Sequence, residues 1–65
     1  MGILHLDAAR VNARLTQEEA AKLLEISKST LINYEKYRTK PSIETSKKIA
    51  NLYGVSVNDL IFFEN

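Results

Sequence analysis

Apolar residues along this chain recur every three or four positions, the spacing that places side chains on one face of a helix. The first such stretch, LDAARVNARL, carries Leu6, Ala9 and Ala13 on one stripe and predicts a helix of about two turns. Alternation of β-branched and polar residues never persists, so no strand is predicted. The pattern therefore predicts an all-α protein.

Four further helices are predicted from residues that favour helix N-termini. Thr16 and Glu19 have the spacing of a capping box, in which each side chain bonds the free backbone N–H of the other residue. Ser27, Ser42 and Ser56 each precede another apolar stretch, namely KSTLINYEKY, IETSKKIANLY and VNDLIFF. The prediction is a compact domain of five short helices.

Isolated helices this short are marginal in water, so their apolar faces must be buried against one another. A chain of 65 residues buries only roughly 60% of its unfolded surface, and without Cys it has neither a disulfide nor a thiolate metal site to stabilise it. A single core is therefore predicted. Its members are Leu6, Ala9, Ala13, Leu15, Ala20, Ala21, Leu24, Ile26, Leu31, Tyr34, Ile49, Ala50, Leu52, Tyr53, Val55, Val57, Leu60 and Ile61.

The length predicts one domain over residues 1–65, and no apolar run approaches the roughly 20 residues of a membrane span. A net charge of +1 says little about partners, but its distribution is uneven. Residues 28–48 carry six basic side chains against two acidic ones, a local excess of +4. Such a concentration is typical of a surface that faces a polyanion, and a solvated face of mixed charge is the alternative.

The stretch QEEAAKLLEISKSTLINYEK breaks its helical spacing at Ile26 and resumes it afterwards. Two helices that cross steeply need a small residue at the crossing, which Ala21 supplies. They also need apolar side chains in the angle between them, which Leu24, Ile26 and Leu31 supply. This pattern predicts a helix-turn-helix unit at about residues 16–36.

In their order and spacing, RLTQEEAA, ISKSTLINYE, KPSIET and LYGVSVNDL resemble the phage-repressor family, the Cro/Xre-type helix-turn-helix DNA-binding domains. The resemblance covers Leu6 to Phe62. It implies a lambda-repressor-like fold of five helices whose third helix, at about 27–36, lies in the major groove of DNA. It further implies a cytoplasmic transcriptional regulator of repressor type, bacterial or phage-encoded, that needs no cofactor.

The third helix is expected to bury Leu31 and Tyr34 and to turn its other face towards the bases. Lysine donates to guanine O6 and N7, asparagine pairs with adenine, and an apolar side chain can meet a thymine methyl group. For Ile32 the alternative is partial burial against a neighbouring loop, and for the other three residues it is an ordinary solvated face. The expected base contacts are Lys28, Ser29, Ile32 and Asn33.

The resemblance places phosphate contacts at the start of the second helix and in the loop after the third. The backbone N–H groups that open the fourth helix also suit an anion, because helix N-termini attract negative charge. The expected phosphate contacts are Thr16, Gln17, Lys36, Arg38, Thr39, Lys40, Ser42 and Ile43.

Family members often pair an Arg on the first helix with the Glu that closes the third, and here these residues are Arg10 and Glu35. Two independent surface charges are the alternative. The family also often carries Gly where this chain has Arg14, Glu25 and Tyr37. If these positions need positive φ, the turns are strained; otherwise their shape differs from that of the family.

Enzymatic chemistry is not predicted. The sole His5 has no second ligand at metal spacing and no nucleophile beside it, and there is no glycine-rich phosphate loop. No small-molecule ligand is predicted either. Two classes remain: a sequence-specific binder of double-stranded DNA, or a protein-interaction module on the same fold, such as an antitoxin or accessory subunit. The polar third helix and the basic loop after it favour the first.

One domain of this size touches few base pairs, so a homodimer on a pseudo-palindromic operator is predicted, with half-sites about 34 Å apart. The C-terminal LIFFEN carries more apolar surface than a helix end needs. Phe62 and Phe63 are therefore the expected dimer contact, with Tyr53 and Val55 beside them. The alternative is that Phe62 covers the core and Phe63 is merely exposed.

Overall fold

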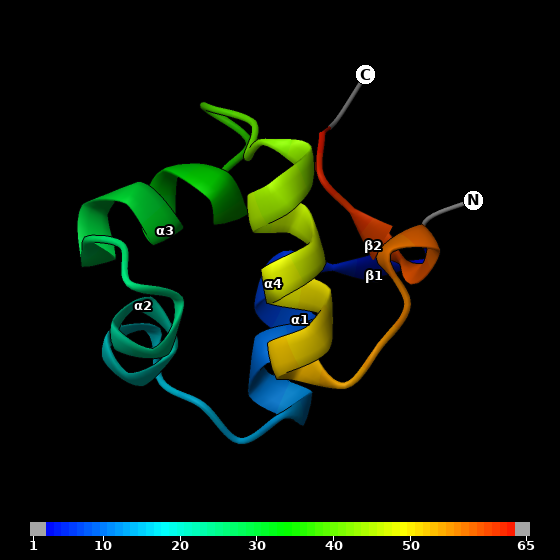
Figure 1. Cartoon of the computed structure of the whole chain (residues 1–65), viewed down its shortest axis with the longest axis horizontal. Coiled ribbons are helices and arrows are strands. Elements are labelled where there is room, and N and C mark those ends of the chain that lie inside the picture. Colours follow the sequence, from blue (N-terminus) through cyan, green and yellow to red (C-terminus); the bar gives the residue numbers. More distant parts are fainter. Residues whose placement is uncertain (1–2, 64–65) are drawn as a thin grey trace.

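The computed structural model describes residues 3–63, which form four α-helices, one 3-10 helix and two short strands. Helix α4 lies in the middle with α1 behind it, α2 and α3 lie to one side, and the strands lie to the other (Figure 1). The elements are β1 (Leu4–His5), α1 (Leu6–Asn12), α2 (Gln17–Leu24), α3 (Lys28–Glu35), α4 (Ile43–Tyr53), the 3-10 helix η1 (Val57–Asp59) and β2 (Leu60–Ile61).

The prediction of a fifth α-helix was wrong, and so was the prediction that the chain has no strand. Ser56 does cap a helix, accepting from the backbone N–H of Asn58 at 3.3 Å, but η1 is a single 3-10 turn. The chain then becomes extended at Leu60, and β2 pairs with β1 in parallel, Leu4 opposite Leu60. The backbone groups of Leu60 and Ile61 are hydrogen-bonded to β1. A helix is therefore not needed to satisfy the hydrogen bonds of these residues.

Helices α2, α3 and α4 begin at the capping residues predicted from the sequence. Thr16 Oγ1 accepts from the Glu19 backbone N–H at 3.1 Å, and a Glu19 carboxylate oxygen accepts from the Thr16 N–H at 2.9 Å, which completes the capping box. Hydrogen bonding of the Glu19 carboxyl group to the backbone of Thr16 first, and to the Thr16 side chain second, lowers the pKa of Glu19. Ser27 and Ser42 accept from backbone N–H groups three residues on, at 3.0 and 3.1 Å.

All four α-helices end in the same backbone turn. The residue with positive φ follows α2 and α4 directly and comes two positions after α1 and α3: φ is 63° at Arg14, 59° at Glu25, 59° at Tyr37 and 72° at Gly54. The N–H of this residue and that of the next bond to carbonyls three and five residues earlier, as in a Schellman motif. Three of the four residues are not glycine, so the turns are strained rather than reshaped, at about 1–2 kcal/mol each.

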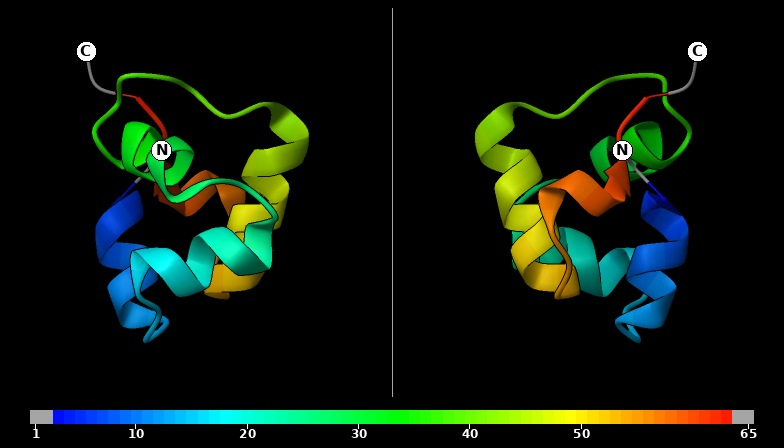
Figure 2. Two further views of the ribbon diagram at one scale, coloured as in Figure 1. Left: turned by 90° about the vertical axis from the view of Figure 1, so that its left-hand side faces the viewer. Right: turned by 90° about the vertical axis from the view of Figure 1, so that its right-hand side faces the viewer.

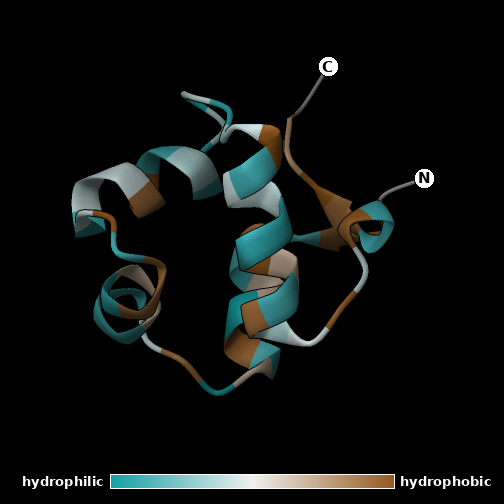
Figure 3. Ribbon diagram, viewed as in Figure 1, coloured by the Kyte–Doolittle hydropathy of each residue, from teal (hydrophilic) through white to brown (hydrophobic). Residues whose placement is uncertain are grey.

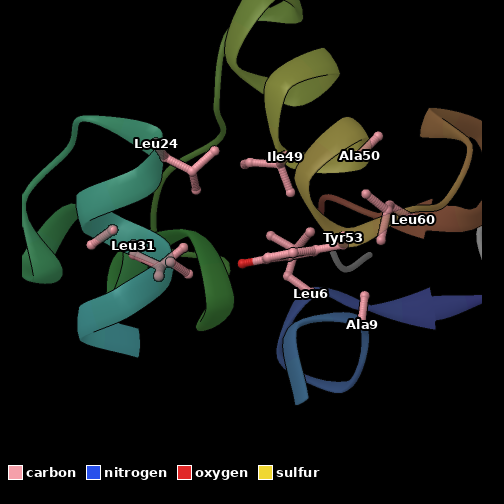
Figure 4. Close-up of a cluster of buried hydrophobic side chains, with 10 residues drawn as sticks. Leu6, Ala9, Leu24, Leu31, Ile49, Ala50, Tyr53 and Leu60 are labelled. Atoms are coloured by element: carbon pink, nitrogen blue, oxygen red, sulfur yellow. The ribbon is translucent and has the colours of Figure 1, made fainter. Parts of the chain in front are cut away.

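The core is built from all four helices and β2 (Figure 4). Each large apolar side chain buried there contributes about 1.5–3 kcal/mol. All ten buried apolar residues belong to the predicted set, namely Leu6, Ala9, Ala20, Ala21, Leu24, Leu31, Ile49, Ala50, Tyr53 and Leu60. The prediction was wrong for Val57, which is 37% exposed because a 3-10 turn replaces the expected helix, and Ile61 is only half-buried.

Candidate nucleic-acid interface

Helix α3 packs one face on the core and turns the other outwards. Leu31 is completely buried, and Tyr34 packs against the core from the same helix. Lys28 and Ser29 at the start of the helix are exposed, while Ile32 and Asn33 are half-buried. In Figure 1, α2 is seen nearly along its axis and α3 from the side, so the two helices cross steeply. Ile32 is thus less exposed than a residue on a free outer face would be.

A buried ion pair holds the end of α3 to α1. Arg10 Nε donates to Glu35 Oε2 at 2.7 Å, and the two side chains are only 13% and 5% exposed. Arg10 also donates to the Leu15 carbonyl at 2.8 Å, and Gln17 Nε2 donates to Glu35 Oε1 at 2.9 Å. The predicted pair is therefore present, and α2 joins it through Gln17. The side-chain amide of Gln17 is bonded to Glu35. Of the groups of Gln17, the backbone N–H is therefore the one left to meet an anion.

The Tyr53 hydroxyl lies on the core side of α3 (Figure 4) and has no hydrogen-bond partner among the described residues. Burial first, and the charge of Glu35 second, raise the pKa of Tyr53 to about 12, against the opposite effect of Arg10. The hydroxyl is thus uncharged at neutral pH. Because the side chain is only 6% exposed, the prediction that Tyr53 adds to a dimer contact was wrong.

The remaining residues of the predicted dimer contact differ in exposure. Phe62 and Val55 are half-buried and pack against the core, in agreement with the alternative stated for Phe62. Phe63 is 57% exposed. Of the described residues at this end of the chain, Phe63 therefore offers the most accessible aromatic surface for a partner.

Two helix N-termini lie among the predicted phosphate contacts. Thr16 and Ser42 are exposed residues whose side chains are occupied by capping bonds. Ile43, the first residue of α4, is 78% exposed. The N–H groups of a first helical turn carry partial positive charge, which attracts an anion.

The loop from the end of α3 to the start of α4 supplies the other predicted phosphate contacts. It connects the two helices over the surface of the molecule (Figure 2), and its hydropathy is largely polar (Figure 3). All four predicted residues in this part of the chain are exposed, namely Lys36, Arg38, Thr39 and Lys40.

Three basic side chains of this surface already have partners within the chain. Lys28 Nζ lies 3.7 Å from Glu18 Oε1, and Arg38 Nη1 donates to Asn33 Oδ1 at 3.4 Å. Lys40 Nζ lies 4.8 Å from the centre of the Phe63 ring. The pair with Glu18 is exposed and contributes about 1 kcal/mol or less, so Lys28 can leave it for a stronger anion or a base.

Sequence reasoning missed a contact between His5 and Tyr37. His5 was expected to be a surface residue, and it is exposed. Its Nδ1 is hydrogen-bonded to the Tyr37 hydroxyl, and the two rings meet edge to face with centres 5.7 Å apart. The residues are 32 positions apart in the sequence, and no local pattern indicates that they meet.

The surface beside the start of α3 carries charges of both signs. A shallow groove of about 400 Å³ there is lined by Glu18, Glu19, Ala21, Lys22, Ile26 and Lys28. Within residues 3–63, no cluster of three His, Cys, Asp or Glu side chains is arranged to hold a metal ion. Nor is any helix of this part of the chain long and apolar enough to cross a membrane. This surface therefore offers hydrogen bonding and charged side chains of both signs.

Comparison with known proteins gives one family match and several similar regulators. Residues 6–60 match the model of a family described as helix-turn-helix. The chain is 41% identical over 51 residues to an uncharacterized HTH-type transcriptional regulator of Methanocaldococcus jannaschii, an alignment that covers 78% of this chain and 77% of that protein.

Two bacterial proteins are similarly close. The chain is 40% identical to the cryptic phage CTXphi transcriptional repressor RstR of Vibrio cholerae and 43% identical to the HTH-type transcriptional regulator ImmR of Bacillus subtilis. The alignments cover 80% and 86% of this chain. They cover only 47% and 44% of the two relatives, so this chain spans less than half of their length.

Proposed function

We propose, from the premise that this chain belongs to the helix-turn-helix family whose model matches residues 6–60, that it is a sequence-specific DNA-binding transcriptional regulator of repressor type. The family binds DNA and is not enzymatic. One observation carries the proposal for this chain: Lys28 and Ser29 are exposed at the start of α3 while Leu31, on the same helix, is completely buried. A helix held in this way presents its N-terminal side chains to a major groove.

Base reading is assigned to the outer face of α3. Lys28 and Ser29 reach base edges first, Asn33 follows about one turn along, and Ile32 offers its accessible part to a thymine methyl group. Because Arg38 donates to Asn33 Oδ1, the Asn33 Nδ2 group is the one left to meet a base. The amide then donates to guanine or thymine, and pairing with adenine through both of its atoms requires Arg38 to move away.

Phosphate contacts surround this helix on both sides. The N-termini of α2 and α4 supply backbone N–H groups, and the loop between α3 and α4 supplies the positive charges of Lys36, Arg38 and Lys40. These contacts carry no sequence information but set the register of α3 on the duplex. They also make the affinity dependent on salt, because each neutralised phosphate releases bound counterions.

The finer parts of the proposal extend this picture. Residues 1–65 form one lambda-repressor-like domain that works in the cytoplasm of a bacterium or as a phage-encoded protein. Two copies bind a pseudo-palindromic operator as a homodimer, because one α3 reads too few base pairs for useful discrimination. Phe63 is the exposed residue assigned to the contact between the copies, with Phe62 supporting it from the core side.

Selection of bound sites from random duplex DNA, followed by affinity measurements at several salt concentrations, tests the proposal. Asn33→Ala should relax the preference at one base position by about 1–3 kcal/mol. Lys36→Ala should weaken binding to all sequences alike and reduce the salt dependence by about one unit of slope. Lys47→Ala, a change of the same type on an exposed position of α4, is the matched control.

Two results would contradict the proposal. If the protein does not bind DNA, the fold serves as a protein-interaction module instead. If Asn33→Ala leaves the selected sequence unchanged while DNA binding persists, α3 is not the element that reads the bases.

A further inference from the structure

The end of α3 differs from the other three helix ends in the residue that comes after the turn. Beyond the position with positive φ, the other ends have Leu15, Ile26 or Val55, and each of these packs against the core. A Schellman motif is frequently accompanied by such an apolar contact. After α3 the corresponding residue is Arg38, which is exposed and touches Asn33 rather than the core. The core therefore does not hold the chain at Arg38, and the next buried residue of the loop is Pro41.

Two contacts from the strand pair reach this loop instead. His5 of β1 is hydrogen-bonded to the hydroxyl of Tyr37, whose ring it also meets edge to face. Phe63, two residues beyond β2, lies with its ring 4.8 Å from Lys40 Nζ. One contact is near each end of segment 37–40, in which all residues but the half-buried Tyr37 are exposed. One comes from β1 and the other from the residues directly after β2, its partner strand. Figure 2 shows the loop and the segment after β2 at the same edge of the molecule.

The residue type at position 37 supports a role for its side chain. The left-handed conformation of Tyr37 is strained for any residue with a Cβ, and Gly would adopt it without that cost. Tyr37 instead supplies a ring and a hydroxyl, and both contact His5. The strain is thus accompanied by a tertiary contact that Gly could not make.

We propose that His5 and Phe63 are positioning residues for DNA binding, which hold the loop 37–40 in place through Tyr37 and Lys40 without touching the DNA. This inference rests on the proposed function, because it treats Arg38, Thr39 and Lys40 as the groups that meet the phosphates. A loop that is already ordered in the free protein loses less conformational freedom when it binds DNA. The affinity for DNA is therefore higher than it would be with a mobile loop. The strand pair thereby tunes the affinity for any duplex and leaves base preference to α3.

The first experiment measures binding of His5→Ala, Tyr37→Phe and Phe63→Leu to a selected operator and to a random duplex. Each single change should weaken binding about threefold to tenfold, the range expected when one ordered side chain becomes mobile. The loss should be the same for both duplexes, so that the ratio of the two affinities stays constant. Tyr37→Phe keeps the ring and removes only the hydroxyl, which makes it the most conservative of the three.

Conservative variants separate positioning from a general structural role. Phe63→Trp keeps an aromatic face for Lys40 and should bind about as the unmodified protein does, whereas Phe63→Leu keeps only apolar bulk. Hydrogen exchange of the free protein gives a readout without DNA: the amides of Tyr37 and Arg38, which are hydrogen-bonded to the carbonyls of Tyr34 and Asn33, should exchange faster in His5→Ala and Tyr37→Phe. The midpoint of thermal unfolding should change little, because all three positions lie outside the buried core.

Several outcomes would overturn the inference, and none of them is the failure of the proposed function. Equal affinities of Phe63→Leu and Phe63→Trp would remove the role of the ring. Unchanged binding and exchange in His5→Ala and Tyr37→Phe would remove the role of the hydrogen bond. If sedimentation shows that Phe63→Leu dissociates the dimer and that the whole loss of binding follows from this, Phe63 acts only in the contact between the copies proposed above and not as a positioning residue. Failure of the proposed function itself appears earlier, as an unmodified protein that does not bind DNA.

Discussion

The two connections that flank α3 begin alike and then diverge. Each starts with a strained left-handed residue, Glu25 before α3 and Tyr37 after it, and each has the same two backbone hydrogen bonds. After Glu25, the side chain of Ile26 packs against the core and Ser27 caps the next helix. After Tyr37, the exposed Arg38 leads into a polar segment that reaches α4 only at residue 43.

The difference shows that the local backbone alone does not decide how firmly a turn is held. The connection before α3 is tied to the core by an apolar side chain, which suits the angle between two helices that must place side chains on base edges. The connection after α3 is tied by the contacts with His5 and Phe63, and its buried residue, Pro41, comes only near the start of α4. That suits a segment that meets phosphates, whose positions vary little with the sequence of the DNA.

The largest expected effect comes from removing the ion pair that holds α3 between these two connections. Glu35→Ala leaves the buried guanidinium of Arg10 without its partner and should lower the free energy of unfolding by about 3–5 kcal/mol. Urea titration measures it. Glu44→Ala, which breaks an exposed pair with Lys48, is the control and should cost about 1 kcal/mol or less. Similar losses in the two variants would show that the buried pair does not hold α3.

The comparison itself is tested by truncating the residue that comes after each turn. Ile26→Ala should lower the free energy of unfolding by about 2 kcal/mol, the lower end of the range for such truncations, because the side chain is only half-buried. Arg38→Ala should change it by about 0.5 kcal/mol or less and should weaken DNA binding instead. Equal losses of stability in the two variants would contradict the contrast between the connections.

Replacing the strained residues by Gly should give a smaller effect. Glu25→Gly relieves about 1–2 kcal/mol of strain and adds up to about 1 kcal/mol of chain entropy to the unfolded state, for a net gain near 0.5 kcal/mol. Tyr37→Gly relieves the same strain but loses the contact with His5, so the stability gain should be smaller and DNA affinity should fall. Unchanged DNA affinity in Tyr37→Gly would show that the side chain is dispensable.

The smallest effect at neutral pH is expected on the core side of α3, at Tyr53. Tyr53→Phe removes a buried hydroxyl that has no partner among the described residues, so stability at pH 7 should stay nearly constant. The pKa of about 12 in the folded protein lies above the ordinary value of 10.0. Because the folded state favours the protonated hydroxyl of Tyr53, this group contributes its full stability below pH 10. That contribution is lost as the pH rises through 12.

Thermal unfolding between pH 9 and pH 12 checks this prediction. Tyr53→Phe should lose less stability over that interval than the unmodified protein. Tyr34→Phe, which changes a half-buried tyrosine on α3, is the control and should keep the alkaline loss. Identical pH profiles for the unmodified protein and Tyr53→Phe would rule out the buried hydroxyl as the cause.

The amino-acid sequence by itself determined the helix starts, the buried apolar residues and the helix-turn-helix unit. These features obey local rules. Thr16, Ser27 and Ser42 cap helices because their side chains bond backbone groups three residues away. Apolar residues at helical spacing must face inwards whatever the details of the packing. The pairing of Arg10 with Glu35 obeys no local rule and was predicted only because family members often have it.

The tertiary structure decided what depends on contacts between distant parts of the chain. The segment after Ser56 becomes a 3-10 turn and a strand because β1, more than 50 residues earlier, offers it backbone partners. Left-handed turns form at Arg14, Glu25 and Tyr37 without glycine, because the packing of the helices outweighs a local preference of about 1–2 kcal/mol. The contact of His5 with Tyr37 has the same origin, since only the folded chain brings these residues together.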